Sequence, residues 1–187
     1  MKYIFIGGIP TSGKSFLAEK IAKAENIAHI DVDVWREEMG KNPALEPWVN
    51  FYWKLNEEEY YKNTSCDKQW ENLKNQSEAL WPQIKHRINK IIKSGKPTIF
   101  EGVSLLPHLI KRDFKFPGIF LLGKSFEETF ERNKKAPRWG KTEELQKMEA
   151  ESFFFCERSH YKQEAEKFGF KIFEDINEAE KEISKLF

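Results

Sequence analysis

The segment 8–15 reads Gly-Ile-Pro-Thr-Ser-Gly-Lys-Ser and matches the full pattern G-x-x-x-x-G-K-[ST]. Glycines let such a loop wrap with its N–H groups pointing inward, where they bind phosphate oxygens. A helix that follows the loop adds unpaired N–H groups and the positive end of its dipole. Lys14 supplies a charge near the β- and γ-phosphates, and the Ser15 hydroxyl can ligate Mg²⁺. The residues predicted to bind a nucleoside triphosphate are Gly8, Ile9, Pro10, Thr11, Ser12, Gly13, Lys14, Ser15 and Phe16.

Two carboxylates stand at the end of a second apolar segment, 28–32. Asp31 and Asp33 are two residues apart and share one face if the strand continues. Acids placed together need nearby positive charge, which Mg²⁺, Lys14 and Arg36 could supply. An acid here can accept the proton of a substrate hydroxyl, and Arg36 can bind an anionic substrate. The pattern leaves open which aspartate is the base. It also leaves open a simple strand end with a helix cap, with Arg36 in a surface ion pair.

Further charged residues follow two later strands. Glu101 ends the apolar segment 97–100, where it could order Mg²⁺ through water or hold the substrate. The segment 132–141 contains five basic residues and no acid, with Pro137 and Gly140 suited to a hinged lid. Arginines from a mobile segment stabilise charge on a transferring phosphoryl group, and we expect Arg132 and Arg138 to do so. The alternatives are a solvated strand end and a solvated basic turn.

The elements that must position these residues alternate between strand and helix patterns, which is typical of the α/β class. Helical patterns follow most of the strands, including a capping-box pattern at Ser125 and Glu128. Gly95 is a candidate helix C-cap, and Pro82 should start or kink its helix. The predicted strands are 3–6, 28–32, 97–100, 119–122 and 170–173.

The segment 40–67 fits this alternation least well. It is rich in Trp and Tyr among acidic residues and shows no strand pattern, so we interpret it as a helical insertion. Ligands of open α/β sheets bind at the carboxyl ends of the strands, and the insertion leaves from such an end. It could therefore cover a substrate, although its rings could also simply pack the insertion against the body of the protein.

Composition limits the remaining possibilities. With 187 residues the chain is expected to form a single domain, 1–187, that includes the insertion and the lid. The net charge of +1 argues against a nucleic-acid coat or a polybasic membrane binder. Cys66 and Cys156 form no metal-ligand spacing and no disulfide framework. With no long apolar stretch and only a short amino-terminal one, we expect a reduced, cytoplasmic compartment and no membrane partner.

Taken together, these residues resemble the P-loop small-molecule kinases, in particular the zeta-toxin, 2-phosphoglycerate-kinase-like and polynucleotide-5′-kinase group. The resemblance rests on the loop 8–15, on Asp33-Val34-Trp35-Arg36 as that group's D-x-x-R, and on Glu101-Gly102-Val103-Ser104-Leu105-Leu106-Pro107. It implies an α/β P-loop NTPase fold with a five-stranded parallel sheet in the order 2-3-1-4-5, flanked by helices. It also implies Asp33 as the base and Arg36 as the substrate anchor. Ser104 departs from the His common in 2-phosphoglycerate-kinase-like proteins, which puts the substrate in doubt.

The function that the sequence favours is a kinase that uses Mg²⁺ and ATP, or GTP, to phosphorylate a hydroxyl or phosphate of a small anionic metabolite. The expected residues are Lys14, Asp33, Arg132 and Arg138 for catalysis, Asp31, Arg36 and Glu101 for substrate, and Ser15 and Asp33 for the metal. The alternatives are a polynucleotide or nucleoside 5′-kinase, a regulatory NTPase or a toxin. A switch GTPase needs an N-K-x-D clamp, which 133–136 lacks. Nucleic acid is not favoured because the charge is near neutral.

Overall fold

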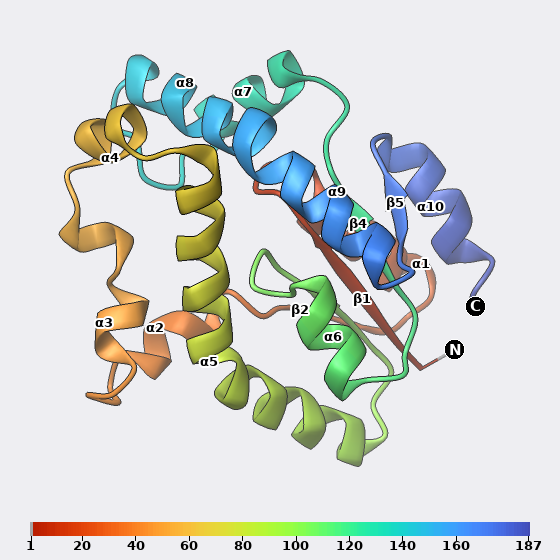
Figure 1. Ribbon diagram of the computed structural model, residues 1–187. Helices are drawn as coiled ribbons and strands as arrows, with labels where there is room; N and C mark the ends of the chain where they lie inside the picture. Colours follow the sequence, from red (N-terminus) through yellow and green to blue (C-terminus); the bar gives the residue numbers. More distant parts are fainter. Residues whose placement is uncertain (1) are drawn as a thin grey trace.

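A five-stranded parallel sheet forms the centre of the computed structural model, which describes residues 2–187. The strand order is β2-β3-β1-β4-β5, so β1 is central and pairs with β3 and β4 (Figure 1). The number and order of the predicted strands are confirmed. Their bounds are β1 Tyr3–Gly8, β2 Ala28–Asp31, β3 Thr98–Glu101, β4 Gly118–Leu121 and β5 Lys171–Phe173.

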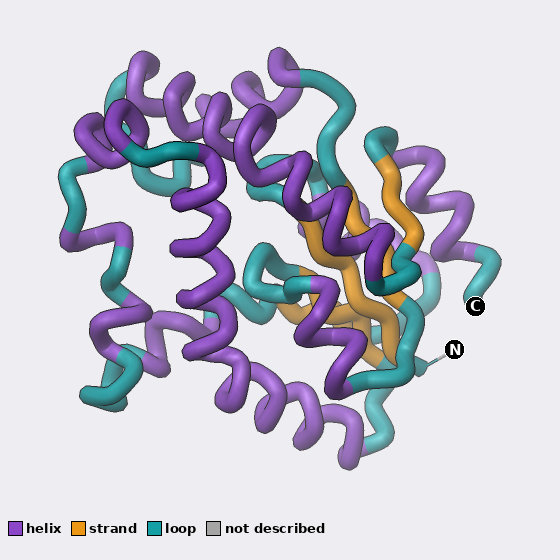
Figure 2. The backbone as a smooth tube through the Cα atoms, in the orientation of Figure 1, coloured by secondary structure: helices purple, strands orange, loops and turns teal. Residues whose placement is uncertain are grey.

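Helices cover both faces of the sheet (Figure 2). Alternate side chains of β1 point to opposite faces, as the period of a strand requires. Ile4 and Ile6 pack with α1 (Lys14–Ala24) and α10 (Ile176–Ser184). Phe5 and its neighbours pack with α5 (Cys66–Ser94), α6 (Pro107–Asp113) and α9 (Arg158–Lys167). The result is three layers, with the carboxyl ends of the strands free to carry a site.

The 29-residue helix α5 follows the predicted boundary signals. The Ser65 side chain accepts a hydrogen bond from the backbone N–H of Lys68, and Gly95 ends the helix at a φ of 73°. Pro82 lies inside the helix, and Figure 1 shows α5 changing direction part-way along its length. Within residues 2–187, no helix has both the length and the apolar character needed to cross a membrane.

The predicted insertion is helical. Figure 1 shows its short helices stacked along one side of α5. α2 lies just before the insertion, and the last residues of the insertion form the start of α5. The bounds are α2 Trp35–Met39, α3 Glu46–Val49, η1 Tyr52–Lys54 and α4 Glu57–Asn63.

The predicted basic lid is only partly a loop. Ser125 caps α7 (Phe126–Lys135) as expected, so the residues from 132 to 135 form the last turn of that helix. The loop proper runs from 136 to 142 and leads to α8 (Glu143–Glu151). α8 continues through a π-helical turn, η2 (Ser152–Glu157), into α9. Turns of this type occur frequently at functional sites.

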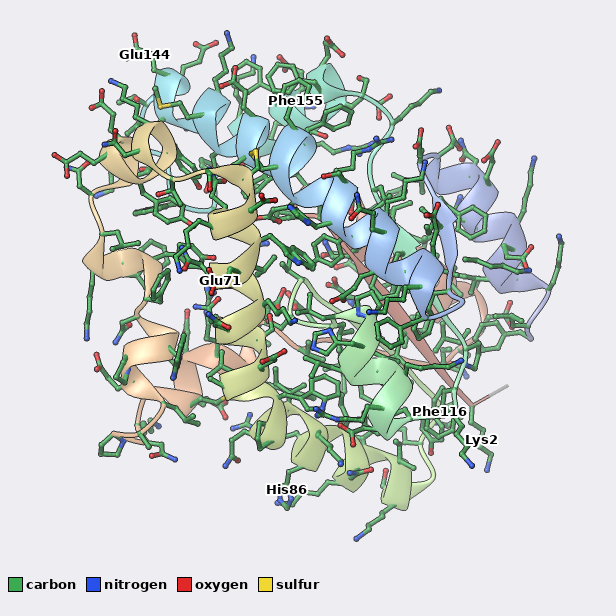
Figure 3. The ribbon with its side chains drawn as sticks, viewed as in Figure 1. Lys2, Glu71, His86, Phe116, Glu144 and Phe155 are labelled. Atoms are coloured by element: carbon green, nitrogen blue, oxygen red, sulfur yellow. A yellow bond between two sulfur atoms is a disulfide. The ribbon has the colours of Figure 1, made fainter. Side chains whose placement is uncertain are left out.

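A disulfide joins Cys66 at the start of α5 to Cys156 in η2. The sequence-based expectation of no disulfide is therefore wrong for this pair. The two residues are 90 positions apart in the chain, and only the packing of α5 against η2 brings them together. Figure 3 shows sulfur atoms where the upper end of α5 meets η2. The bond ties the insertion side of the protein to η2.

Breaking this disulfide should destabilise the protein. A cross-link that closes a loop of this length restricts the unfolded chain, with a stabilising contribution of about 4–5 kcal/mol in the chain-entropy model. We expect reductant, or the paired substitutions Cys66→Ser and Cys156→Ser, to lower the free energy of unfolding measured in urea. The double variant should not respond to reductant. Equal urea midpoints for oxidised, reduced and substituted protein would contradict this expectation.

Candidate functional site

The loop between β1 and α1 has the geometry expected of a phosphate cradle. Gly8 and Gly13 have φ angles of 127° and 98°, a region that favours glycine. A Cβ on Gly8 would lie 2.0 Å from the backbone oxygen of Leu121, so no other residue fits there. Inside the loop, the Ser12 hydroxyl and the Lys14 ammonium both donate to the backbone oxygen of Ile9, at 2.9 and 2.7 Å.

Lys14 is 5% exposed, and burial lowers its pKa. The nearby carboxylate of Glu101 opposes that shift, as Asp33 and Asp31 also do. The ammonium group therefore lies among acids at the carboxyl edge of the sheet and has only a backbone oxygen as its hydrogen-bond acceptor. A phosphate group would be a stronger partner for this ammonium group.

A first pocket, the nucleotide pocket, surrounds the open side of the cradle. Most of the predicted nucleotide-binding residues line it, whereas Gly8, Ile9 and Ser12 are buried behind it and Pro10 faces a second pocket. Asp31 and Glu101, which we expected to bind the substrate, line this nucleotide pocket. Its walls are Thr11, Gly13, Lys14, Ser15, Phe16, Asp31, Asp33, Glu101, Arg132, Ala136 and Arg138.

Three acids meet at this edge of the sheet because of the strand register. Asp31 pairs with Glu101 across β2 and β3, and Asp33 follows two residues after Asp31. Burial raises the pKa of Asp31 to about 6, and the neighbouring charges of Asp33 and Glu101 add to that shift. Glu101 is 1% exposed, and its Oε1 lies 3.4 Å from Nε2 of His29, whose pKa it raises. Such a cluster attracts a cation.

These residues fit Mg²⁺ bound together with a triphosphate. Within residues 2–187, no three His, Cys, Asp or Glu side chains form a metal site by themselves. Mg²⁺ in kinase sites is commonly held by one or two protein oxygens, several waters and the phosphates, so a complete protein cage is not required. Ser15 and the acids Asp31 and Glu101 supply oxygens in the nucleotide pocket.

Asp33 is held by a dense set of hydrogen bonds. Its Oδ2 accepts from the backbone N–H of Val103 at 2.7 Å, and its Oδ1 accepts from the N–H and hydroxyl of Ser104 at 3.1 and 2.7 Å. Burial alone would raise the pKa of Asp33, but Arg138 and these hydrogen bonds outweigh burial and lower it. Asp33 is therefore ionised at neutral pH and fixed in orientation.

A second pocket, the acceptor pocket, opens on the other side of Asp33. Asp33 and Arg138 line both pockets, so the two cavities meet at this pair. The remaining walls are Pro10, Arg36, Tyr52, Trp53, Tyr60, Tyr61, Leu73, Gln76, Val103, Ser104, Trp139, Glu149, Ser152, Phe153 and Glu157.

The two arginines of the predicted lid have different environments. Arg132 donates from Nη1 to the backbone oxygens of Thr11 and Ser12, at 3.4 and 3.2 Å, and pairs with Glu128. Arg132 therefore braces the cradle itself. Arg138 is exposed in the loop after α7, and among the described residues no hydrogen bond or ion pair holds its guanidinium. Its charge lies near Asp33, Lys14 and Glu157, where it is free to bind a phosphoryl group.

Several residues of the acceptor pocket were not predicted as site residues. Trp139 of the loop packs against Tyr52, Tyr60 and Tyr61 of the insertion, with ring centroids 6.1, 6.1 and 5.8 Å apart. The insertion rings thus form part of the pocket wall and also pack against the lid. Glu149 lies in α8 and Glu157 in η2, both after Thr142 in the chain. No local motif marks these residues.

Comparison with known proteins reveals likeness in structure only. No family model matches the sequence, and no curated protein matches it significantly. Shikimate kinase from Acinetobacter baumannii, in complex with shikimate, aligns over 100% of this chain and 92% of its own, with a TM-score of 0.57 and 13% identity. Shikimate kinase from Bacteroides thetaiotaomicron aligns over 99% and 97%, with a TM-score of 0.57 and 16% identity.

Deoxyadenosine kinase from M. mycoides, with bound dATP, aligns over 98% of this chain and 97% of its own, with a TM-score of 0.52 and 19% identity. These three structures are not members of the zeta-toxin group, so that narrower resemblance stays a prediction. At such identities the likeness shows the fold. Together with the strand order and the cradle, it shows that this chain has the α/β fold of the P-loop kinases.

Proposed function

We propose that this protein is a kinase that transfers the γ-phosphoryl group of Mg²⁺-bound ATP to a hydroxyl group of a small molecule. The observation that carries this proposal is the junction of the two pockets at Asp33 and Arg138. A triphosphate in the cradle would direct its last phosphate toward this junction. An acceptor in the second pocket would approach the same point, with a carboxylate and a free guanidinium beside it.

The expected chemical step is a direct displacement at phosphorus. The acceptor hydroxyl donates its proton to the Asp33 carboxylate, its oxygen forms a bond to the γ-phosphorus, and the bond from that phosphorus to the β,γ-bridging oxygen breaks. The products are a phosphorylated acceptor and ADP. The hydrogen bonds from Val103 and Ser104 orient Asp33 for this role. A phosphate acceptor has no such proton to give at neutral pH, which favours a hydroxyl.

Positive groups stabilise the charge that spreads over the moving phosphoryl group. Lys14 reaches it from the cradle, Arg138 reaches it from the lid loop, and Arg132 keeps the cradle in shape. Mg²⁺, when bound with the nucleotide, neutralises phosphate charge. Ser15, with Asp31 or Glu101, would hold it. Asp33 would be left to the acceptor, although the sequence suggested it for the metal as well.

A screen with labelled ATP tests this proposal. Pools of sugar alcohols, hydroxy acids, sugar phosphates, nucleosides, amino alcohols and a 5′-hydroxyl oligonucleotide would be incubated with protein and Mg²⁺, and labelled products would be separated by chromatography. We expect label on at least one small-molecule pool. Label on the oligonucleotide alone would favour a polynucleotide kinase. Hydrolysis that no pool stimulates would favour a regulatory NTPase.

A further inference from the structure

Glu157 is a buried carboxyl group in the acceptor pocket without a hydrogen-bond partner on one oxygen. It stands at the end of the π-helical turn η2 and is 8% exposed. Its Oε2 accepts no hydrogen bond from the described residues, and no ion pair forms between Glu157 and any of them. Leaving a buried polar atom unpaired costs about 1–3 kcal/mol. A native site retains such an atom for a reason, and a ligand can supply the missing donor.

Glu149 provides an internal comparison, because it is also a buried glutamate on the wall of the same pocket. Its carboxylate accepts a hydrogen bond from Asn133 at 2.8 Å, and although burial raises the pKa of Glu149, this bond and the nearby backbone N–H groups of Trp139 and Gly140 oppose the rise. Glu149 is therefore occupied in holding the lid loop. Glu157 has no such structural partner on Oε2, so a structural role does not explain it.

The surroundings of Glu157 are mixed in charge. Burial raises its pKa to about 7, with Arg138 and Lys14 opposing the shift and Glu149 adding to it. Four phenol groups lie near enough to feel its charge, from η1, α4 and α9: Tyr52, Tyr60, Tyr61 and Tyr161. Carboxyl groups and phenols therefore face Glu157 together, and an anionic group placed directly against its ionised carboxylate would be repelled.

The rest of the wall is aromatic. Tyr52, Trp53, Tyr60, Tyr61 and Trp139 contribute flat apolar surface. Rings of this kind bind apolar and ring-shaped ligands, or cations over their faces, far better than hydrated phosphates. Arg36 and Arg138 are the cations of this pocket, and Arg138 is shared with the nucleotide side.

We propose that Glu157 determines acceptor specificity by binding a hydroxyl or amino group of the acceptor. This group is distinct from the hydroxyl whose proton Asp33 accepts. The acceptor is then a neutral or cationic alcohol with an apolar, ring-sized body and a second hydrogen-bond donor. This inference rests on the proposed kinase function. A neutral or cationic acceptor takes the place of the anionic acceptor that the sequence analysis expected from Arg36.

The first test measures the thermal stability of the free protein and does not need an acceptor. Because the pKa of Glu157 is raised in the folded state, the fold favours the neutral carboxyl, and stability is lost as pH rises through about 7. Glu157→Gln should therefore raise Tm at pH 8 and change it little at pH 5. Burial also raises the pKa of Glu149, but Glu149→Gln disturbs the hydrogen bond from Asn133 as well, so it should raise Tm at pH 8 less than Glu157→Gln does. A lower Tm for Glu157→Gln at pH 8 would mark a structural residue and overturn the proposal.

The second test compares acceptors with labelled ATP. One arm contains deoxynucleosides and phenylalaninol, which carry a ring, a hydroxyl and a further donor. The other contains shikimate and glycerate, which are hydroxy acids. We expect transfer in the first arm. For the best acceptor, Glu157→Gln should raise KM about tenfold or more while kcat falls less, and wild-type KM should rise as pH falls below 7.

The outcomes separate the two claims. Transfer only to hydroxy acids would overturn the specificity assignment and leave the kinase function standing. An unchanged acceptor KM in Glu157→Gln would also overturn it. Absence of transfer in both arms would count against the proposed function, and the specificity assignment would fall with it.

Discussion

Replacing Asp33 with asparagine should lower the rate of phosphoryl transfer by about 10²–10⁴ while Mg²⁺-ATP still binds. Asparagine has nearly the same shape, but it cannot accept the acceptor's proton. Its amide group would also face the N–H donors of Val103 or Ser104 in place of an oxygen. The measurement is single-turnover transfer of labelled phosphate, with ATP affinity determined separately on the same preparation.

The matched control is Asp31→Asn, at the neighbouring aspartate in the nucleotide pocket. Because Asp31 does not line the acceptor pocket, its loss should act mainly on binding of Mg²⁺-ATP. If Asp31→Asn abolished transfer at saturating nucleotide while Asp33→Asn remained active, the assignment of the two aspartates would be reversed.

Removing the guanidinium of Arg138 should lower kcat by about 10³ or more, the range observed for arginines that stabilise a transferring phosphoryl group. In the structure no partner among the described residues holds this group, and its side chain borders both pockets. Arg138→Ala should therefore act on the chemical step more than on the KM for ATP. Steady-state kinetics with the acceptor identified by the screen would measure the two parameters.

Two other basic residues serve as controls for Arg138. Lys141→Ala alters an exposed charge in the same loop and should leave kcat within about twofold. Arg132→Ala should raise the KM for ATP, because Arg132 braces the backbone of Thr11 and Ser12. An Arg138→Ala variant with wild-type kcat would remove this residue from the chemistry.

The sequence predicted the parts of the site that depend on local structure. The cradle is a contiguous motif between one strand and one helix, and its glycine conformations follow from its own residues. Asp33 and Glu101 were found because strand ends are recognisable and parallel strands end at the same edge. Capping at Ser125 depends on Glu128, three positions away, so it too could be predicted from the sequence.

The parts that sequence reasoning missed depend on contacts between distant segments. Glu157 carries no motif, and its place on the pocket wall follows from the way η2 packs against α5 and lines one pocket together with residues of the insertion. Likewise, Cys66 and Cys156 meet only in the folded chain. The separation of Asp31 and Glu101 from the acceptor pocket depends on side-chain directions at the sheet edge, which spacing alone did not give.

The central claim is that the loop 8–15 binds the triphosphate, and calorimetric titration of Mg²⁺-ATP into wild type and Lys14→Ala tests it most directly. We predict one saturable site in the wild-type protein. Loss of the buried ammonium, which otherwise has only the Ile9 backbone oxygen to bind, should weaken binding about 100-fold. Equal affinities for the two proteins, with Lys14→Ala shown to be folded, would contradict the account.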